Sequence, residues 1–149
     1  SSDLDFAVDG RLDLVVSETF GVVRYYRHLG PKNNPIFDLP VVIAETKDRG
    51  MVDAIDWNGD GRMDVIVGTS DGRVMVFLNT GTRSAPKFSQ PLILNLPPII
   101  EPRVIIADID GSGQQDLFIP GTQGSCLISR TFLEHGYANS RLLRVERKK

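Results

Sequence analysis

One short acidic loop occurs three times in the chain, and this repeat constrains the fold more than any other feature of the sequence. The three copies run over residues 5–13, 56–64 and 108–116, and we call them loops one, two and three. Aspartate stands at the first and ninth positions of every loop, and glycine stands at the sixth. The loops begin 51 and 52 residues apart. A fixed period of this length indicates a repeat architecture in which each unit is one supersecondary element.

The similarity between the copies continues beyond the loops. In the first two copies an apolar segment led by glycine follows at the same offset, over residues 21–26 and 72–77. A tail with matching residues comes next, at Gly30, Pro35, Phe37 and Pro40 and at Gly81, Pro86, Phe88 and Pro91. In the third copy a segment that begins at Gly124 takes this place, and the match becomes loose after it. We therefore divide the chain into three units of about residues 1–50, 51–102 and 103–149.

Each unit is rich in β-branched residues and turn residues, and no segment shows a sustained helical period. In the second unit we expect strands over residues 51–56, 64–67 and 73–78 and a fourth between 87 and 95. Pro91 should push that fourth strand to a sheet edge, because proline cannot donate to a ladder. Four antiparallel strands in about 50 residues is typical of a β-propeller blade. The sequence therefore predicts an all-β fold built from propeller blades.

The strand count predicts an incomplete ring. Only four residues precede loop one, so the first unit should lack its first strand. The third unit should recover a fourth strand over residues 141–146. The total corresponds to about 2.75 blades, whereas propellers close with roughly four to eight. We therefore expect residues 1–149 to form one partial propeller that pairs with additional blades from the same or another chain.

The acidic loops have the chemistry of a cation site. Short oxygen-bearing side chains alternate along the loop, and the glycine at position six permits a sharp reversal of the chain. Hard oxygen ligands without nitrogen or sulfur favour calcium, which takes about 6–8 donors at roughly 2.3–2.6 Å. An EF-hand is excluded because its twelfth position requires a bidentate glutamate. Here the twelfth positions are Val16, Val67 and Ile119. Position nine must therefore close any such site.

These loops, their flanking strands and the tail from Gly81-Thr82 to Pro86 and Phe88 resemble the VCBS/FG-GAP repeats of integrin-like β-propellers. The resemblance covers nearly the whole chain. The Phe-Gly and Gly-Ala-Pro signatures of integrin α subunits are not evident, so the bacterial VCBS-type repeat is the closer match. The resemblance implies that each loop lies between two strands of a blade and binds structural Ca²⁺.

The resemblance also implies a ligand set for each loop. Loop two would use Asp56, Asn58, Asp60, the Arg62 carbonyl and Asp64. Loop three would use Asp108, Asp110, Ser112, the Gln114 carbonyl and Asp116. Loop one offers Asp5, Asp9, the Arg11 carbonyl and Asp13, but Ala7 replaces one side-chain ligand. The alternative is that the loops are Asx-type turns without an ion. Against it, several converging carboxylates repel each other unless a cation lies between them.

Two other features suggest a ligand or a reaction, and each has a simpler interpretation. Trp57 could stack against a sugar, but its equivalents Phe6 and Ile109 are also apolar, which favours packing between blades. The run 24–28 (Arg-Tyr-Tyr-Arg-His) offers groups that a propeller-fold polysaccharide lyase would need. Its equivalent in the second unit is an ordinary strand, so we interpret it as a strand with charges at its edge. No catalytic constellation is evident in the sequence.

Composition excludes several classes of function. The 149 residues carry 17 Lys and Arg against 19 Asp and Glu, so the formal charge of −2 gives no general reason to expect nucleic acid as a partner. No apolar run reaches the roughly 18–20 residues that span a bilayer. Cys126 is the single cysteine, so no disulfide can form within the chain.

The resemblance implies an extracellular binding or adhesion module, secreted or at the cell surface, with a carbohydrate or a protein as ligand. The alternatives are part of a propeller-fold polysaccharide lyase or another carbohydrate-active enzyme, and a purely structural module of a large cell-surface protein.

Overall fold

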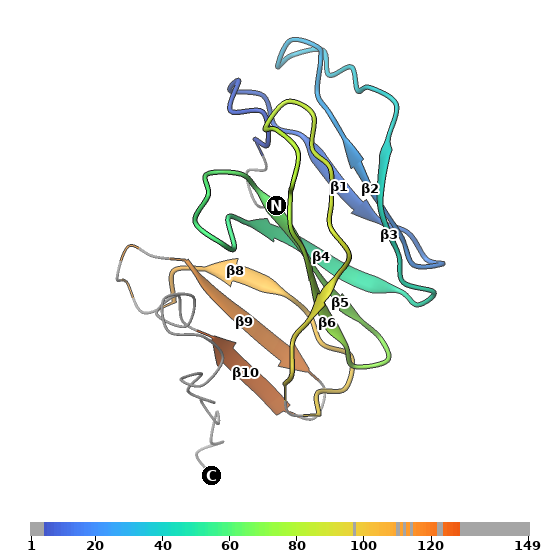
Figure 1. Cartoon of the computed structure of the whole chain (residues 1–149), viewed down its shortest axis with the longest axis vertical. Coiled ribbons are helices and arrows are strands. Elements are labelled where there is room, and N and C mark those ends of the chain that lie inside the picture. Colours follow the sequence, from blue (N-terminus) through green and yellow to red (C-terminus); the bar gives the residue numbers. More distant parts are fainter. Residues whose placement is uncertain are drawn as a thin grey trace.

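The computed structural model describes residues 5–96, 98–109, 111, 113, 115–121 and 124–128 of the chain. Within these residues every regular element is a β-strand, and the strands form three separate antiparallel sheets that follow one another along the molecule (Figure 1). No helix in this part of the chain is long and apolar enough to cross a membrane. The all-β fold of partial propeller blades that the sequence predicts is confirmed, and the described sheets do not close into a ring.

The first sheet has three strands in the order β1 (Leu14–Ser17), β2 (Val22–Tyr26) and β3 (Val41–Glu45). Residue 21 turns the chain between β1 and β2 with φ of +79°, and a Cβ there would lie 2.6 Å from the carbonyl oxygen of Asp48. Only glycine fits such a left-handed and crowded position. The strand that the second unit carries before its acidic loop has no counterpart among the described residues of the first unit.

The second sheet is the only complete four-stranded blade among the described residues. Its strands follow the order β4 (Gly50–Ile55), β5 (Asp64–Thr69), β6 (Val74–Phe77) and β7 (Leu92–Ile93). The predicted first three strands are confirmed. The fourth strand lies within the predicted range of 87–95 and is short: only Leu92 and Ile93 pair with β6, and Phe88 adds one isolated bridge to Asn79. The proline at position 91 interrupts the ladder between them.

The third sheet contains β8 (Ile105–Ala107), β9 (Asp116–Gly121) and β10 (Gly124–Ile128), in the order β10-β9-β8. The strand predicted over residues 141–146 lies outside the described residues. Loops one, two and three each end where a strand begins or is about to begin, so each acidic loop lies at one end of a sheet.

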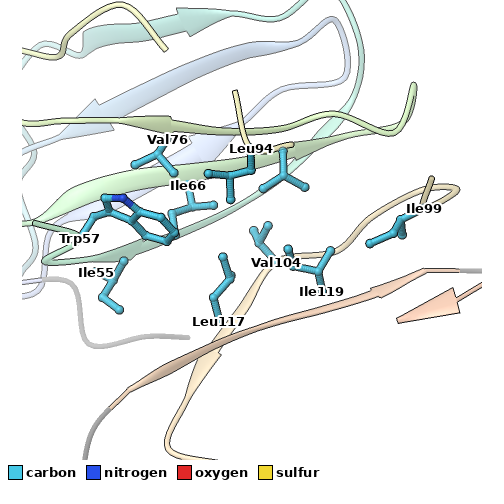
Figure 2. Packing of buried hydrophobic residues seen from close by; sticks show 10 residues of the cluster. Ile55, Trp57, Ile66, Val76, Leu94, Ile99, Val104, Leu117 and Ile119 are labelled. Carbon is cyan, nitrogen blue, oxygen red and sulfur yellow. The ribbon is translucent and has the colours of Figure 1, made fainter. Parts of the chain in front are cut away.

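The core lies between the sheets in two clusters. Alternation along β6 supplies both: Met75 and Phe77 pack toward the first sheet, and Val74 and Val76 pack toward the third. The cluster between the first and second sheets also contains Phe6 and Tyr25. Figure 2 shows the other cluster, in which side chains of the second and third sheets meet around Trp57, Ile66, Leu117 and Ile119. Trp57 is 7% exposed in this cluster, which confirms the packing interpretation.

Candidate functional site

The first aspartate of each loop holds the chain reversal. In loop two the carboxylate of Asp56 accepts the N–H of Asp60 at 3.0 Å and the N–H of Gly61 at 2.8 Å. Asp5 accepts the equivalent N–H groups in loop one, at 3.1 and 2.7 Å. In loop three, Asp108 accepts the N–H of residue 113 at 2.8 Å. The three loops therefore share one backbone fold, and the first aspartate forms it.

Position four of each loop takes the left-handed conformation. It is glycine in loops two and three, at Gly59 with φ of +75° and Gly111 with φ of +74°. In loop one it is Val8, with φ of +55°. A β-branched residue is strained in this region. Loop one therefore keeps the shared backbone at a cost that the other two loops avoid.

The ninth aspartate of each loop is buried and turned toward the sheet. In loop two, Asp64 accepts the N–H of Trp57 at 2.9 Å and the N–H of Asn79 at 2.7 Å. In loop one, Asp13 accepts the N–H of Phe6 at 3.0 Å and the N–H of His28 at 2.8 Å. In loop three, Asp116 accepts the N–H of Ile109 at 3.1 Å. In loops one and two this carboxylate therefore ties position two of the loop to a residue that follows the neighbouring strand of the same sheet. That residue is His28, after β2, for loop one and Asn79, after β6, for loop two.

The three carboxylates of loop two act on one another. Burial raises the pKa of Asp64 above its ordinary value, although the N–H groups that it accepts act in the opposite direction. The negative charges of Asp60 and Asp56 raise this pKa further. The charges at positions one and five therefore act against ionisation of the carboxyl at position nine.

Positions three, five and seven of loop two form an exposed network. The Asp60 N–H is shared between Asp56 and the side-chain oxygen of Asn58, which lies 3.1 Å away. The Asp60 carboxylate accepts the backbone N–H of Arg62 at 2.9 Å and its Nη2 at 2.5 Å. The Arg62 Nε donates to the carbonyl of Asn79 at 2.8 Å, so the guanidinium is fixed to the blade. A second guanidinium reaches the loop from Arg83, whose Nε donates to the carbonyl of residue 61 at 2.7 Å.

Loop one repeats the pairing of position five with position seven. Its Asp9 carboxylate pairs with the Arg11 guanidinium at 2.7 Å and lies 3.7 Å from that of Arg27. Although desolvation acts to raise it, the pKa of Asp9 is held below its ordinary value by Arg11 and by the charge of Arg27. In the sequence of loop three the same two positions are Ser112 and Gln114, which carry no charge. These two residues and Asp110 lie outside the described residues.

The donor set of loop two fits calcium by its chemistry. Asp56, Asn58 and Asp60 supply side-chain oxygens on the exposed side of the loop, and hard oxygen donors are what Ca²⁺ prefers. Over the described residues, no three acidic, histidine or cysteine side chains are already gathered as a metal cluster. Arg62 holds the Asp60 carboxylate in this arrangement, so a guanidinium supplies positive charge to the loop. Loop one has a poorer donor set because Ala7 carries no oxygen in its side chain.

The run of aromatic and basic residues near β2 is structural. Tyr25 is buried and donates its hydroxyl to Asp13 at 3.1 Å, and burial first, then the negative Asp13, raises the pKa of Tyr25 far above its ordinary value. Arg24 pairs with Glu18 at the other face of the sheet. Arg27 reaches the second unit, where its Nη1 donates to the carbonyl of Ser84 at 3.2 Å. The strand interpretation of this run is confirmed.

The sequence did not indicate the backbone partners Asn79 and His28 or the loop contact of Arg83. For Arg11 and Arg62 a signal was present: arginine stands at position seven wherever aspartate stands at position five, and both charges are lost together in loop three. Like charges brought together need compensation, so such a paired change indicates contact between the two positions.

The model of the FG-GAP-like repeat matches residues 5–67 and again residues 56–119. No curated protein matches the chain significantly. Each match begins at the first aspartate of an acidic loop and extends through the following loop into the strand behind it, so the period of the family agrees with the period of the sheets. The chain belongs to the family of FG-GAP-like repeat proteins.

Proposed function

We propose that this β-propeller-like module binds structural Ca²⁺ in its acidic loops and serves as an extracellular binding or adhesion module for a carbohydrate or protein ligand. The observation that carries the calcium proposal is the crowding of charge in loop two. There, burial is the largest cause that raises the pKa of Asp64, and the negative charges of Asp60 and Asp56 raise it further. A divalent cation at this loop relieves the repulsion, because a cation favours the charged form of every carboxylate around it.

The residues of loop two would contact the ion from two sides. Asp56, Asn58 and Asp60 hold the ion from the exposed side, and the Arg62 carbonyl and Asp64 complete the set that the family resemblance implies. When bound, the ion supplies charge neutralisation and a cross-link between β4 and β5. Loop three offers a similar set at Asp108, Asp110, Ser112, Gln114 and Asp116, and loop one offers Asp5, Asp9, Arg11 and Asp13.

The calcium affinity that we expect of such a site supports a location outside the cell. Only part of the oxygen set is charged, and Arg62 competes for Asp60. Extracellular calcium modules bind with dissociation constants of about 10⁻⁴–10⁻³ M, which is weak enough to require the calcium concentration outside cells. We therefore propose a secreted or cell-surface protein.

A groove between the first and second sheets supports a polar ligand. It measures about 580 Å³, within the range of ligand sites, and its lining residues include Glu45, Lys47, Arg73, Gln90 and Phe88. Charged and amide groups beside an aromatic ring suit the hydroxyl groups and apolar faces of a sugar, or a polar peptide segment. Further blades of the same kind, from this or another chain, complete the propeller around these sheets.

Calorimetric titration with Ca²⁺ tests the metal proposal, with Mg²⁺ as a comparison. At 10 mM Ca²⁺ and a dissociation constant of about 0.1–1 mM, binding should add roughly 1.4–2.7 kcal/mol to the free energy of unfolding. Asp56→Asn should abolish most of the heat from loop two, whereas Asp71→Asn, outside the loops, should leave it unchanged. No heat of binding together with no change in melting temperature on chelation would contradict the proposal.

A glycan array tests the ligand class. Binding of the labelled chain without turnover supports a binding module, and Lys47→Ala and Gln90→Ala should weaken the signal. Release of unsaturated uronates from a bound polysaccharide, read by absorbance, would contradict it in favour of a lyase.

A further inference from the structure

One face of the first sheet is exposed, whereas the equivalent face of the second sheet is covered by the neighbouring sheet. In the second sheet, Val65, Val67, Met75 and Phe77 face the first sheet and are buried by it. By the internal repeat their equivalents in the first sheet are Leu14, Val16, Arg24 and Tyr26. Leu14 is 44% exposed and Val16 is 38% exposed. The first sheet therefore presents, uncovered, the face that a neighbouring sheet covers one unit later.

This face is hollowed beside loop one. The hollow measures about 680 Å³, and Leu12, Leu14, His28, Pro35 and Phe37 are among its lining residues. We call it the first-sheet hollow. His28 is buried, and its Nε2 has no hydrogen-bond partner among the described residues. Asn79, the equivalent of His28 in the second unit, also keeps one side-chain nitrogen without a partner, so the open apolar lining distinguishes the first-sheet hollow and the polar atom does not.

In the second unit the same place is filled by one residue of loop one. The equivalents of Leu12 and Phe37 are Met63 and Phe88, and both pack against the cluster that contains Phe6. Phe6 is fully buried, and its ring packs edge-on against the Phe88 ring, with 6.4 Å between the ring centroids. Phe6 stands at position two of loop one. An apolar residue at position two thus fills the hollow of the next unit.

The rule repeats at the next interface. Trp57 stands at position two of loop two and packs with Leu117 of the third sheet (Figure 2). Leu117 is the third-unit equivalent of Leu14. At position two of loop three stands Ile109, which is 47% exposed, and the nearby Ile105 of β8 is 42% exposed. The described part of the chain therefore has an unfilled hollow at its first sheet and an uncovered position-two residue at its third.

We propose that the first-sheet hollow binds the third unit of a second copy of this chain, with Ile109 entering it as Phe6 enters the second unit. The proposal rests on the proposed function in one respect, that further blades complete the propeller. A second copy is the occupant because the chain itself carries both halves of the contact. The hollow is lined by one basic residue, Lys32, and one acidic residue, Asp5, and loop three brings Asp108 and no arginine at position seven, so Lys32 is the group that Asp108 can pair with.

The contact is head-to-tail, because the two surfaces differ. Such contacts build closed rings when the rotation closes and open chains when it does not. Within the assembly each copy then buries one hollow and one position-two residue.

Sedimentation velocity over a range of protein concentrations tests this contact, in excess chelator and again with Ca²⁺. The unmodified chain should associate as its concentration rises. Leu14→Glu in the hollow and Ile109→Glu at the third unit should each be monomeric, with unchanged circular dichroism. Phe20→Glu is the matched control, since Phe20 is 85% exposed in the turn before β2 and outside the contact.

Mixing the two variants gives the sharpest result. The Leu14→Glu copy keeps an intact third unit and the Ile109→Glu copy keeps an intact hollow, so an equimolar mixture should form a one-to-one dimer that grows no further. An unmodified chain that stays monomeric at every concentration, or a Leu14→Glu variant that associates like the unmodified chain, would overturn the proposal. Because the contact is measured with and without Ca²⁺, its failure leaves the calcium titration of the loops to be judged by itself.

Discussion

Removal of the Asp64 carboxylate should destabilise the blade more than removal of any exposed carboxylate. Asp64 is fully buried and accepts two backbone N–H groups, from Trp57 at 2.9 Å and from Asn79 at 2.7 Å. In Asp64→Ala both N–H groups lose their partner inside the protein. Each buried donor left without a partner costs about 1–3 kcal/mol, so the two together cost roughly 2–6 kcal/mol.

Part of this cost is offset by the charge that disappears. Burial raises the pKa of Asp64, so above the unfolded-state pKa the ionised carboxylate itself costs free energy in the fold. Its deletion recovers that contribution. We therefore expect a loss in the lower half of the range, about 2–4 kcal/mol. For a chain of this length that corresponds to a fall in melting temperature on the order of 10 °C.

Urea unfolding followed by circular dichroism measures the loss. Asp64→Asn is the milder variant, because it keeps one acceptor oxygen and turns an amide N–H₂ toward the other donor. Its loss should be about 1–3 kcal/mol. Asp71→Ala is the control, since its carboxylate is half-exposed and pairs with Arg73 at the surface, where such pairs contribute about 0–1 kcal/mol. If Asp64→Ala costs no more than Asp71→Ala, the buried carboxylate does not tie the loop to the sheet.

Three further predictions follow from named contacts. Tyr25→Phe removes the hydroxyl that donates to Asp13 at 3.1 Å, and urea unfolding should show a loss of about 1–2 kcal/mol; an unchanged midpoint contradicts this. Arg62→Gln removes the guanidinium that competes with the ion, so calorimetry should show calcium affinity up to about fivefold higher, and a weaker affinity contradicts this. The hydrogen bond from Arg73 holds the pKa of Asp71 at about 2 against an ordinary 3.8. The stability that Asp71 contributes is therefore present above its ordinary pKa and is lost as the pH falls toward 2. In Arg73→Met the pKa of Asp71, measured by NMR titration, should rise toward 3.8, and a pKa that stays near 2 contradicts this.

The repeat made much of the fold predictable. Alternating β-branched residues and glycine-led turns placed β4, β5 and β6 within about two residues of their observed bounds. The apolar character of position two in every loop predicted packing between blades, and Phe6 and Trp57 are buried there. These features depend on local pattern and on the period, which the sequence displays directly.

The direction in which each loop carboxylate points could not be predicted. Asp56 and Asp64 are the same residue type in the same motif, but Asp56 folds the exposed turn and Asp64 is buried against the sheet. Which role each takes depends on the backbone N–H groups that the sheet presents, and these include that of Asn79, fifteen residues away. The first-sheet hollow was likewise hidden, because exposure of Leu14 depends on which sheet covers it and not on its local sequence.

A crystal structure of the chain grown with Ca²⁺ tests the central claim most directly, namely that the exposed oxygens of loop two bind an ion while the ninth aspartate anchors the loop. Anomalous difference density should appear at loop two between Asp56, Asn58 and Asp60, with the Asp60 carboxylate released from Arg62. Asp64 should contact the ion as well, while it keeps its bonds to the N–H groups of Trp57 and Asn79. No density at loop two, with Arg62 still paired to Asp60 at a saturating Ca²⁺ concentration, would contradict the claim.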